Sequence, residues 1–156
     1  MPAAKAEAAV EFTRILLARE GRVWVHEASD SMSPLIRPGD QLCLRPLAST
    51  DARPGMIIAF QRDGDLIVHR LLRATPAGLV TKGDALVDAD APVSTGEIVA
   101  RVAAIRSPAG RLIDLDRAPW PRIGSVLAAV ARIPAATSLT RKALRIPCHL
   151  AAVLGR

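Results

Sequence analysis

The sequence contains few aromatic residues: its 156 residues include no tyrosine, two phenylalanines and two tryptophans. Proteins that bind single-stranded nucleic acid without sequence preference use several exposed rings on which the bases stack. We therefore expect no nucleic-acid partner. Hydrophobic residues nevertheless make up 50% of the chain. This proportion excludes a disordered chain, and the length suits one domain with a hydrophobic core.

Cysteine is also scarce, because Cys43 and Cys148 are the two that the chain contains. They lie far apart and match no metal-ligand spacing, so a disulfide framework and a zinc site are not indicated. We expect two buried thiols, and neither a metal nor another cofactor.

Long uncharged apolar segments are missing as well. The longest apolar run near the N-terminus, residues 15–18, is too short for the core of a signal peptide. No run reaches the roughly 18 residues of a membrane-spanning helix. We expect a protein that is cytoplasmic or attached peripherally to a membrane.

Acidic residues are absent from the C-terminal quarter of the chain. From residue 117 onward the charged residues are seven bases, Arg117, Arg122, Arg132, Arg141, Lys142, Arg145 and Arg156. Residues 1–116 hold the other fourteen bases against fifteen acids, so the body of the protein is almost neutral. Such a distribution is typical of a tail that binds an anionic partner, and we expect a membrane surface.

The hydrophobic pattern divides the chain into an N-terminal helix (1–21), a β-rich domain (22–116) and a basic helical tail (117–156). In the first segment an apolar stripe of helical period includes Phe12 and Ile15, and Gly21 is a suitable end. Short β-type runs follow at residues 23–25, 41–47, 56–61, 66–72, 78–81 and 97–105. Asp63-Gly64 lies between two runs and indicates a hairpin. The pattern predicts a small, mainly antiparallel β-domain.

In the tail, Ser125 and Ser138 are candidate N-caps of two short helices, which Pro134 and Pro147 would end. Their apolar faces with basic residues opposite are typical of helices that lie on a membrane surface. Alternatively, these helices pack on the β-domain and leave their arginines in solvent.

Three segments carry the chemistry. The first, S-D-S-M-S-P-L-I-R-P-G-D at residues 29–40, precedes a β run and places Ser31 in a turn. The second, G-D-L-I-V-H-R-L-L at residues 64–72, places His69 on an apolar strand. The third, T-K-G-D-A-L-V-D-A-D at residues 81–90, contains Asp84, Asp88 and Asp90. Taken alone, the first segment is typical of a turn, the second of a strand with a buried histidine, and the third of an ordinary loop. The three segments together, in this order, are a far more specific indication of function than any one of them.

Together these segments resemble the three sequence boxes of the signal peptidase I family, whose fold is shared with self-cleaving repressors. The H-R dipeptide is similar to the base box of the archaeal and endoplasmic-reticulum branch, in which histidine replaces lysine. The resemblance covers roughly residues 23–106 and implies a small antiparallel coiled β-barrel and a serine endopeptidase that acts on a leader or signal peptide.

The resemblance also implies the roles of the residues. Ser31 would be the nucleophile and His69 the general base, a pairing that suits a hydroxyl that needs its proton removed. Asp90 would orient His69, with Asp84 supporting the site and Asp88 as a third possibility. The Ser31 backbone N–H and the Ser29 hydroxyl would be the oxyanion donors. Small substrate side chains, one and three residues before the scissile bond, would fit pockets lined by residues such as Ile57 or Val68.

The sequence departs from the family pattern at Asp30, where a small residue is usual, at Ala85-Leu86, where amides are usual, and in lacking a membrane anchor. Two other functions remain open. A self-cleaving repressor would need a DNA-binding domain and a lysine base, for which Lys82 is the nearest lysine. A non-catalytic β-barrel scaffold would use its basic tail to bind an anionic surface.

Overall fold

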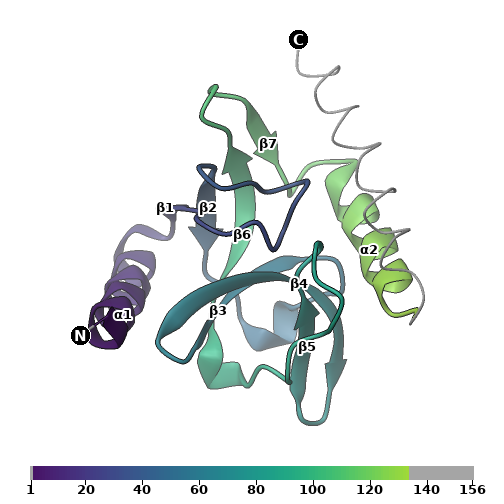
Figure 1. Ribbon diagram of the computed structural model, residues 1–156, viewed down its shortest axis with the longest axis horizontal. Coiled ribbons are helices and arrows are strands. Elements are labelled where there is room, and N and C mark those ends of the chain that lie inside the picture. Colours follow the sequence, from purple (N-terminus) through teal and green to yellow (C-terminus); the bar gives the residue numbers. More distant parts are fainter. Residues whose placement is uncertain (1, 134–156) are drawn as a thin grey trace.

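The computed structural model describes residues 2–133 of the chain. Among these residues the fold consists of one antiparallel sheet and two α-helices, which flank it on opposite sides (Figure 1). The helices and strands are α1 (Pro2–Glu20), β1 (Val23–His26), β2 (Gln41–Arg45), β3 (Ile57–Arg62), β4 (Asp65–Thr75), β5 (Gly78–Lys82), β6 (Ile98–Arg106), β7 (Leu112–Asp114) and α2 (Trp120–Ala131), with short 3₁₀ turns at Ser49–Asp51 and Thr95–Glu97.

The seven strands pair in the order β1-β2-β6-β3-β4-β5, and β7 adds to β6. Every pairing is antiparallel, which confirms the mainly β fold. The expectation of a barrel was wrong in one respect, because within the described residues β1 and β5 remain at the two ends of the sheet and the sheet does not close. Register shifts near Cys43, Ala59 and Leu71 interrupt the ladders, and such bulges bend and twist strands.

The six predicted β runs correspond to β1 to β6, and β4 is longer than expected at both ends. The predicted hairpin joins β3 to β4 through Asp63 (φ 53°) and Gly64 (φ 86°). Positive φ at both turn residues matches the right-handed twist of the flanking strands, and Asp and Gly tolerate it. Strand β7 was not predicted, because three residues are too few for a strand pattern to be seen.

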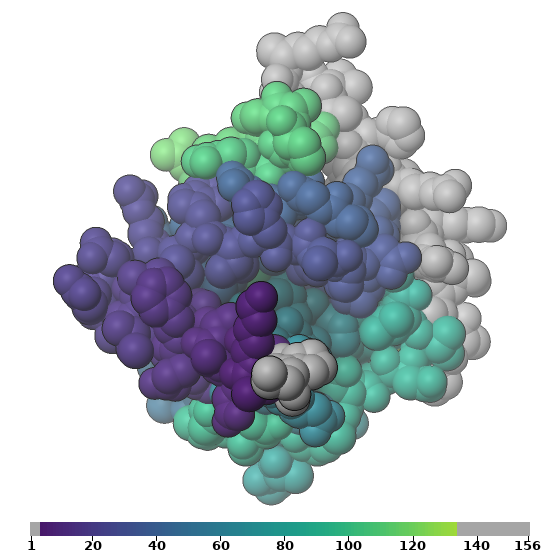
Figure 2. Space-filling model, turned by 60° about the vertical axis from the view of Figure 1, so that its left-hand side comes forward, coloured from purple at the N-terminus to yellow at the C-terminus, as the bar shows by residue number. Residues whose placement is uncertain are grey.

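The N-terminal helix ends at Gly21 as predicted, with φ 70° and a hydrogen bond from its N–H to the Leu17 carbonyl (3.0 Å). The prediction of its buried face was wrong. Val10 and Leu17 are buried against the sheet, whereas Phe12 and Ile15 are 61% and 48% exposed. The helix lies on the surface beside the β1–β2 segment (Figure 2). Because the helix is rich in alanine, its faces differ little in hydrophobicity, and the sequence does not indicate clearly which face is buried.

The C-terminal helix begins at Trp120, so Ser125 is not its N-cap. The Ser125 Oγ instead donates to the Pro121 carbonyl inside the helix (3.0 Å). Leu127 belongs to the hydrophobic core, and Gly124 lies so close to Gly55 that a Cβ on it would be 2.6 Å from the Gly55 carbonyl oxygen. This helix therefore packs on the β-domain. The second predicted tail helix, from Ser138, lies outside the described residues.

No helix within residues 2–133 combines the length and the hydropathy needed to span a membrane. The buried apolar side chains form two clusters, of which the larger joins α1, the sheet and α2. The smaller surrounds Phe60 and Leu71 on β3 and β4. The residues singled out from the sequence lie where these strands meet the loops after β1 and β5.

Candidate active site

Ser31 lies in the turn between β1 and β2, and this turn is held by its own apolar residues. Met32, Leu35 and Ile36 are between 0% and 6% exposed, so they fix the turn to the core. The buried Asp40 accepts a hydrogen bond from the Arg37 N–H (2.9 Å). Ser31 itself is only half-buried, so its hydroxyl can be reached from solvent.

His69 lies on β4, directly opposite Ile58 of β3, and is 5% exposed. The edge of its ring faces Phe60, with 6.1 Å between the ring centroids. Its Nε2 lies 3.2 Å from the Ser31 Oγ, and its Nδ1 lies 2.7 Å from the Asp90 Oδ2. One imidazole therefore joins the hydroxyl to the carboxylate.

Asp90 lies in the loop after β5 and is held by that strand. Its N–H donates to the Thr81 carbonyl (2.8 Å), and its Oδ2 accepts a hydrogen bond from the Thr81 hydroxyl (2.6 Å). Arg62 binds the carbonyls of Ala91 and Pro92 and so holds the segment that follows.

The charge state of Asp90 determines which tautomer of His69 the site contains. Burial disfavours the carboxylate, but hydrogen bonds from His69 and Thr81 and the positive charge of Arg62 outweigh it and hold the pKa of Asp90 below its usual range. An ionised carboxylate only accepts hydrogen bonds, so the Nδ1 of His69 carries a proton. The Nε2 of the neutral ring is then free to accept the proton of the Ser31 hydroxyl.

Ser29 lies beside Ser31, with 3.2 Å between the two hydroxyl oxygens. Because Ser31 has one hydroxyl proton and directs it to His69, Ser29 is the donor in that state. Its position is fixed by Glu27, whose Oε1 accepts the Ser29 N–H at 2.7 Å. Among the described residues the Ser31 N–H makes no hydrogen bond, so it is available to a ligand.

Asp84, which the sequence analysis grouped with the catalytic residues, does not contact His69. It forms a bidentate ion pair with Arg70, at 2.8 Å and 2.7 Å, and both side chains are buried. The third arm of the guanidinium donates to the Gly55 carbonyl (2.9 Å). Asp84 therefore ties the loop after β5 to β4.

The two remaining candidates lie outside this arrangement. Asp88 is exposed, and no hydrogen bond joins Lys82 to Ser31 within the described residues.

No role was predicted from the sequence for Thr81, Glu27 or Arg70. Arg70 and Thr81 stand inside the quoted motifs, but only the folded chain shows which partner each one meets.

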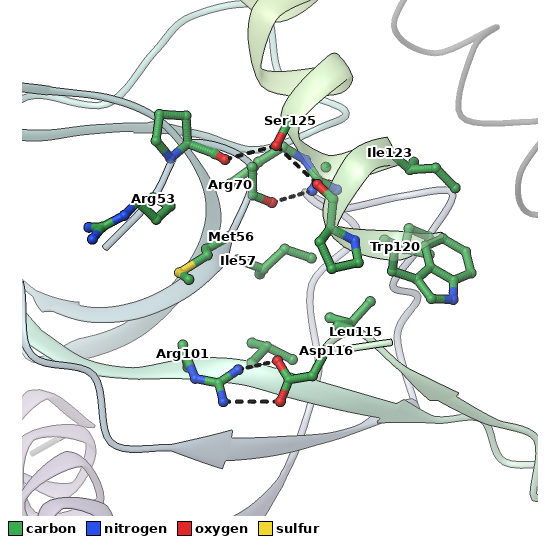
Figure 3. A pocket seen from close by; sticks show the side chains of 16 residues that line it. Arg53, Met56, Ile57, Arg70, Arg101, Leu115, Asp116, Trp120, Ile123 and Ser125 are labelled. Atoms are coloured by element: carbon green, nitrogen blue, oxygen red, sulfur yellow. Dashed lines mark hydrogen bonds and ion pairs between the residues drawn. The ribbon is translucent and has the colours of Figure 1, made fainter. Parts of the chain in front are cut away.

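A groove of about 570 Å³ runs past Ser31 and His69. Apolar side chains of β1, β2 and β4 line it, among them Val25, Leu42 and Val68. Ile57, expected beside Val68, instead lines a separate cavity of about 250 Å³ near α2 (Figure 3). None of the candidate catalytic residues lines that second cavity. The 2–133 part of the chain contains no cluster of three or more potential metal ligands.

A serine, a histidine and an aspartate linked in this order by hydrogen bonds form the arrangement of a serine hydrolase. The family model described as Peptidase S24-like matches residues 2–103. This match covers more than half of the chain, and the chain belongs to the Peptidase S24-like family. That family includes signal peptidase I-like enzymes and self-cleaving repressors. No curated protein and no solved structure shows significant similarity to the chain.

The three aspartates between β5 and η2 (Thr95–Glu97) should differ in their effect on stability. Asp84→Asn should lower the free energy of unfolding by about 3–5 kcal/mol, because it leaves the buried Arg70 guanidinium without its charge partner. Asp90→Asn should cost about 1–3 kcal/mol through weaker hydrogen bonds. Asp88→Asn, at an exposed site, should remain within about 0.5 kcal/mol of the parent. Urea unfolding measures all three, and a larger loss in Asp90→Asn than in Asp84→Asn would contradict these assignments.

Proposed function

We propose that the protein is a serine endopeptidase of the signal-peptidase type, which removes a leader or signal peptide from a protein or peptide substrate. The observation that carries the proposal is the continuous link from the Ser31 Oγ through His69 to Asp90, with distances of 3.2 Å and 2.7 Å. A distance of 3.2 Å is within the hydrogen-bond reach that proton transfer to a general base requires.

In the first step the Ser31 Oγ attacks the scissile carbonyl carbon while its proton passes to the Nε2 of His69. The new C–O bond pushes the carbonyl electron pair onto oxygen, and the Ser31 N–H and Ser29 hydroxyl are the donors for this oxyanion. Each such donor is worth about 10²–10³ in rate. Asp90 accepts the hydrogen bond from the His69 Nδ1–H throughout and stabilises the imidazolium.

In the second step the C–N bond breaks, and His69 gives its proton to the leaving amine. Water then attacks the acyl-enzyme by the same route, with His69 as base, and releases the new carboxylate together with Ser31. The two half-reactions use one histidine alternately as base and acid, and no group other than those of this chain and water is needed.

The alternative within the family is a self-cleaving repressor. The neighbour of the Ser31 hydroxyl supports the peptidase proposal instead, because it is His69 rather than a lysine. The scaffold alternative would not need a nucleophile, a base and an orienting carboxylate within hydrogen-bond reach of one another.

Ser31→Ala and His69→Ala should each abolish cleavage of a peptide library, read by mass spectrometry, and leave the unfolding transition in place. The parent protein should also react covalently with a fluorophosphonate probe at Ser31. Because members of a triad act as a unit, the double variant should lose little more activity than either single one. Absence of both cleavage and labelling in the parent would favour the scaffold, and retained activity in His69→Ala would direct attention to Lys82.

The resemblance to signal peptidases leads us to propose small side chains at the first and third residues before the scissile bond. Val68 lines the groove beside Ser31 and supports this proposal, whereas Ile57 is placed elsewhere. Products cut after bulky residues would count against it.

The charges in the groove support a second preference, for a basic residue near the scissile bond. The chain has more bases than acids, yet among the described residues the groove is lined by Glu27 and Asp65 and by no lysine or arginine. An unlike charge at the surface contributes on the order of 1 kcal/mol, so we expect about a fivefold preference. Asp65→Asn should reduce this preference in the library, whereas Asp63→Asn, the same change two residues away and outside the groove, should not. Equal profiles for both variants would contradict the role of Asp65.

We propose further that residues 117–156 attach the protein to an anionic membrane surface. In the described part of this segment, α2 uses Leu127 to pack on the domain. Val126 and Ile133 remain 62% and 57% exposed, and Arg122 and Arg132 are exposed as well. The exposed apolar and basic side chains support the proposal. The packing of α2 on the domain also agrees with the alternative, in which the tail helices cover the β-domain and leave their arginines in solvent.

The test is co-sedimentation of the full chain with anionic and with neutral vesicles. Each arginine near an anionic bilayer contributes about 1 kcal/mol, so Arg122→Gln/Arg132→Gln should weaken binding about tenfold or more. The matched variant Arg73→Gln/Arg111→Gln removes two exposed arginines elsewhere and should bind like the parent. Equal binding by both variants, or no preference for anionic lipid, would overturn the proposal.

A further inference from the structure

Thr81 is a neighbour of Asp90 and is completely buried, with 0% of its surface exposed. It lies on β5 and contacts Asp90 twice. Its carbonyl accepts the Asp90 N–H (2.8 Å), and its Oγ1 donates to the Asp90 Oδ2 (2.6 Å). The same Oδ2 accepts the Nδ1–H of His69 (2.7 Å). Two donors from neighbouring strands therefore meet at a single oxygen.

We propose that Thr81 is a positioning residue of the catalytic site, whose hydroxyl holds the Asp90 carboxylate in the orientation that serves His69. This inference rests on the proposed peptidase function, because it assigns Thr81 a role in that reaction. Thr81 touches neither Ser31 nor the groove, so it acts through Asp90 alone.

Such a residue is needed because an aspartate carboxylate can rotate about its side-chain torsion. The torsion that turns an aspartate carboxylate is broad, so a backbone contact alone does not fix the direction of its oxygens. Asp90 is only partly buried, and its other neighbours, among them Arg62, bind the main chain beyond it. The Thr81 hydroxyl is the contact that determines which oxygen faces His69.

The same hydrogen bond affects the charge of the pair. A donor to an ionised carboxylate stabilises the negative charge, and the Thr81 hydroxyl is one of the causes that lower the pKa of Asp90 against the effect of burial. Without that donor, the uncompensated carboxylate would draw a proton to the His69–Asp90 pair more readily. The Asp90 carboxylate would then take up a proton at a higher pH than in the parent protein.

Thr81→Val replaces the hydroxyl with a methyl group of similar shape and suits a strand. It should reduce kcat about ten- to a hundredfold, the effect of losing one hydrogen bond to a charged group. KM should change little, since Thr81 does not contact the groove. The acid limb of the kcat/KM profile, which reports proton uptake by the coupled pair, should move to higher pH. Thr81→Ser keeps the hydroxyl and should restore both the rate and the profile.

The control is Thr13→Val, the same change at another buried threonine, whose Oγ1 donates to the Ala9 carbonyl in α1 (2.8 Å). It should leave the rate and the profile unchanged. If Thr81→Val does not fold, Thr81→Cys, with a weak S–H donor, takes its place and should fall between the parent and a variant without a donor. Parent-like kinetics in Thr81→Val would overturn the proposal. So would a uniform loss of rate in Thr81→Val and Thr81→Ser with an unmoved acid limb, which is the mark of a purely structural role.

A second readout does not depend on catalysis. The carboxyl carbon of Asp90, followed by NMR during an acid titration, should titrate at higher pH in Thr81→Val than in the parent protein. If the titration moves while no peptide is cleaved and no fluorophosphonate is bound, the hydrogen bond exists as described and the peptidase function fails. If cleavage is normal and the titration does not move, the peptidase function stands and the role of Thr81 fails.

Discussion

The hydrogen bond between the His69 Nδ1 and the Asp90 Oδ2 is the contact on which the site depends. It joins a central strand to the loop that follows an edge strand, and it determines the tautomer of the imidazole. That tautomer leaves Nε2 free, and only then can the half-buried Ser31 hydroxyl donate its proton to a base. The position of Ser31 is set independently, by apolar anchors such as Met32 and Ile36.

Two adjacent residues of strand β4 have different partners: His69 contacts Asp90, and Arg70 contacts Asp84. This difference arises because adjacent residues on a strand face opposite sides. Both aspartates belong to the segment after β5, and β5 pairs with β4. A buried ion pair requires every partner in place. The Arg70–Asp84 pair therefore keeps this segment close to β4. The hydrogen bonds from His69 and Thr81 then orient the Asp90 carboxylate.

Much of the fold could be predicted, because the strands are short apolar runs and the turns between them contain Gly, Pro and Asp. The hairpin at Asp63-Gly64 is an example, since its turn residues match the positive φ that the strands require. The buried face of α1 was predicted wrongly, because Phe12 and Ile15 formed the apolar stripe while the sheet buries Val10 and Leu17. The start of α2 at Trp120 was also missed, since a helix that packs through Leu127 and Gly124 needs no serine cap.

The sequence by itself determined the residue types of the site and their order, because Ser31, His69 and the aspartates stand in recognisable motifs. It also determined that His69 would lie on an apolar strand, since the apolar run at residues 66–72 is a local pattern. Only the tertiary structure decided which aspartate meets the imidazole. Asp84, Asp88 and Asp90 lie within seven residues of one another, and the pairing of β4 with β5 directs Asp84 to Arg70 and Asp90 to His69. The role of Thr81 has the same origin, because a strand residue and the loop that returns to it meet only after the sheet has formed.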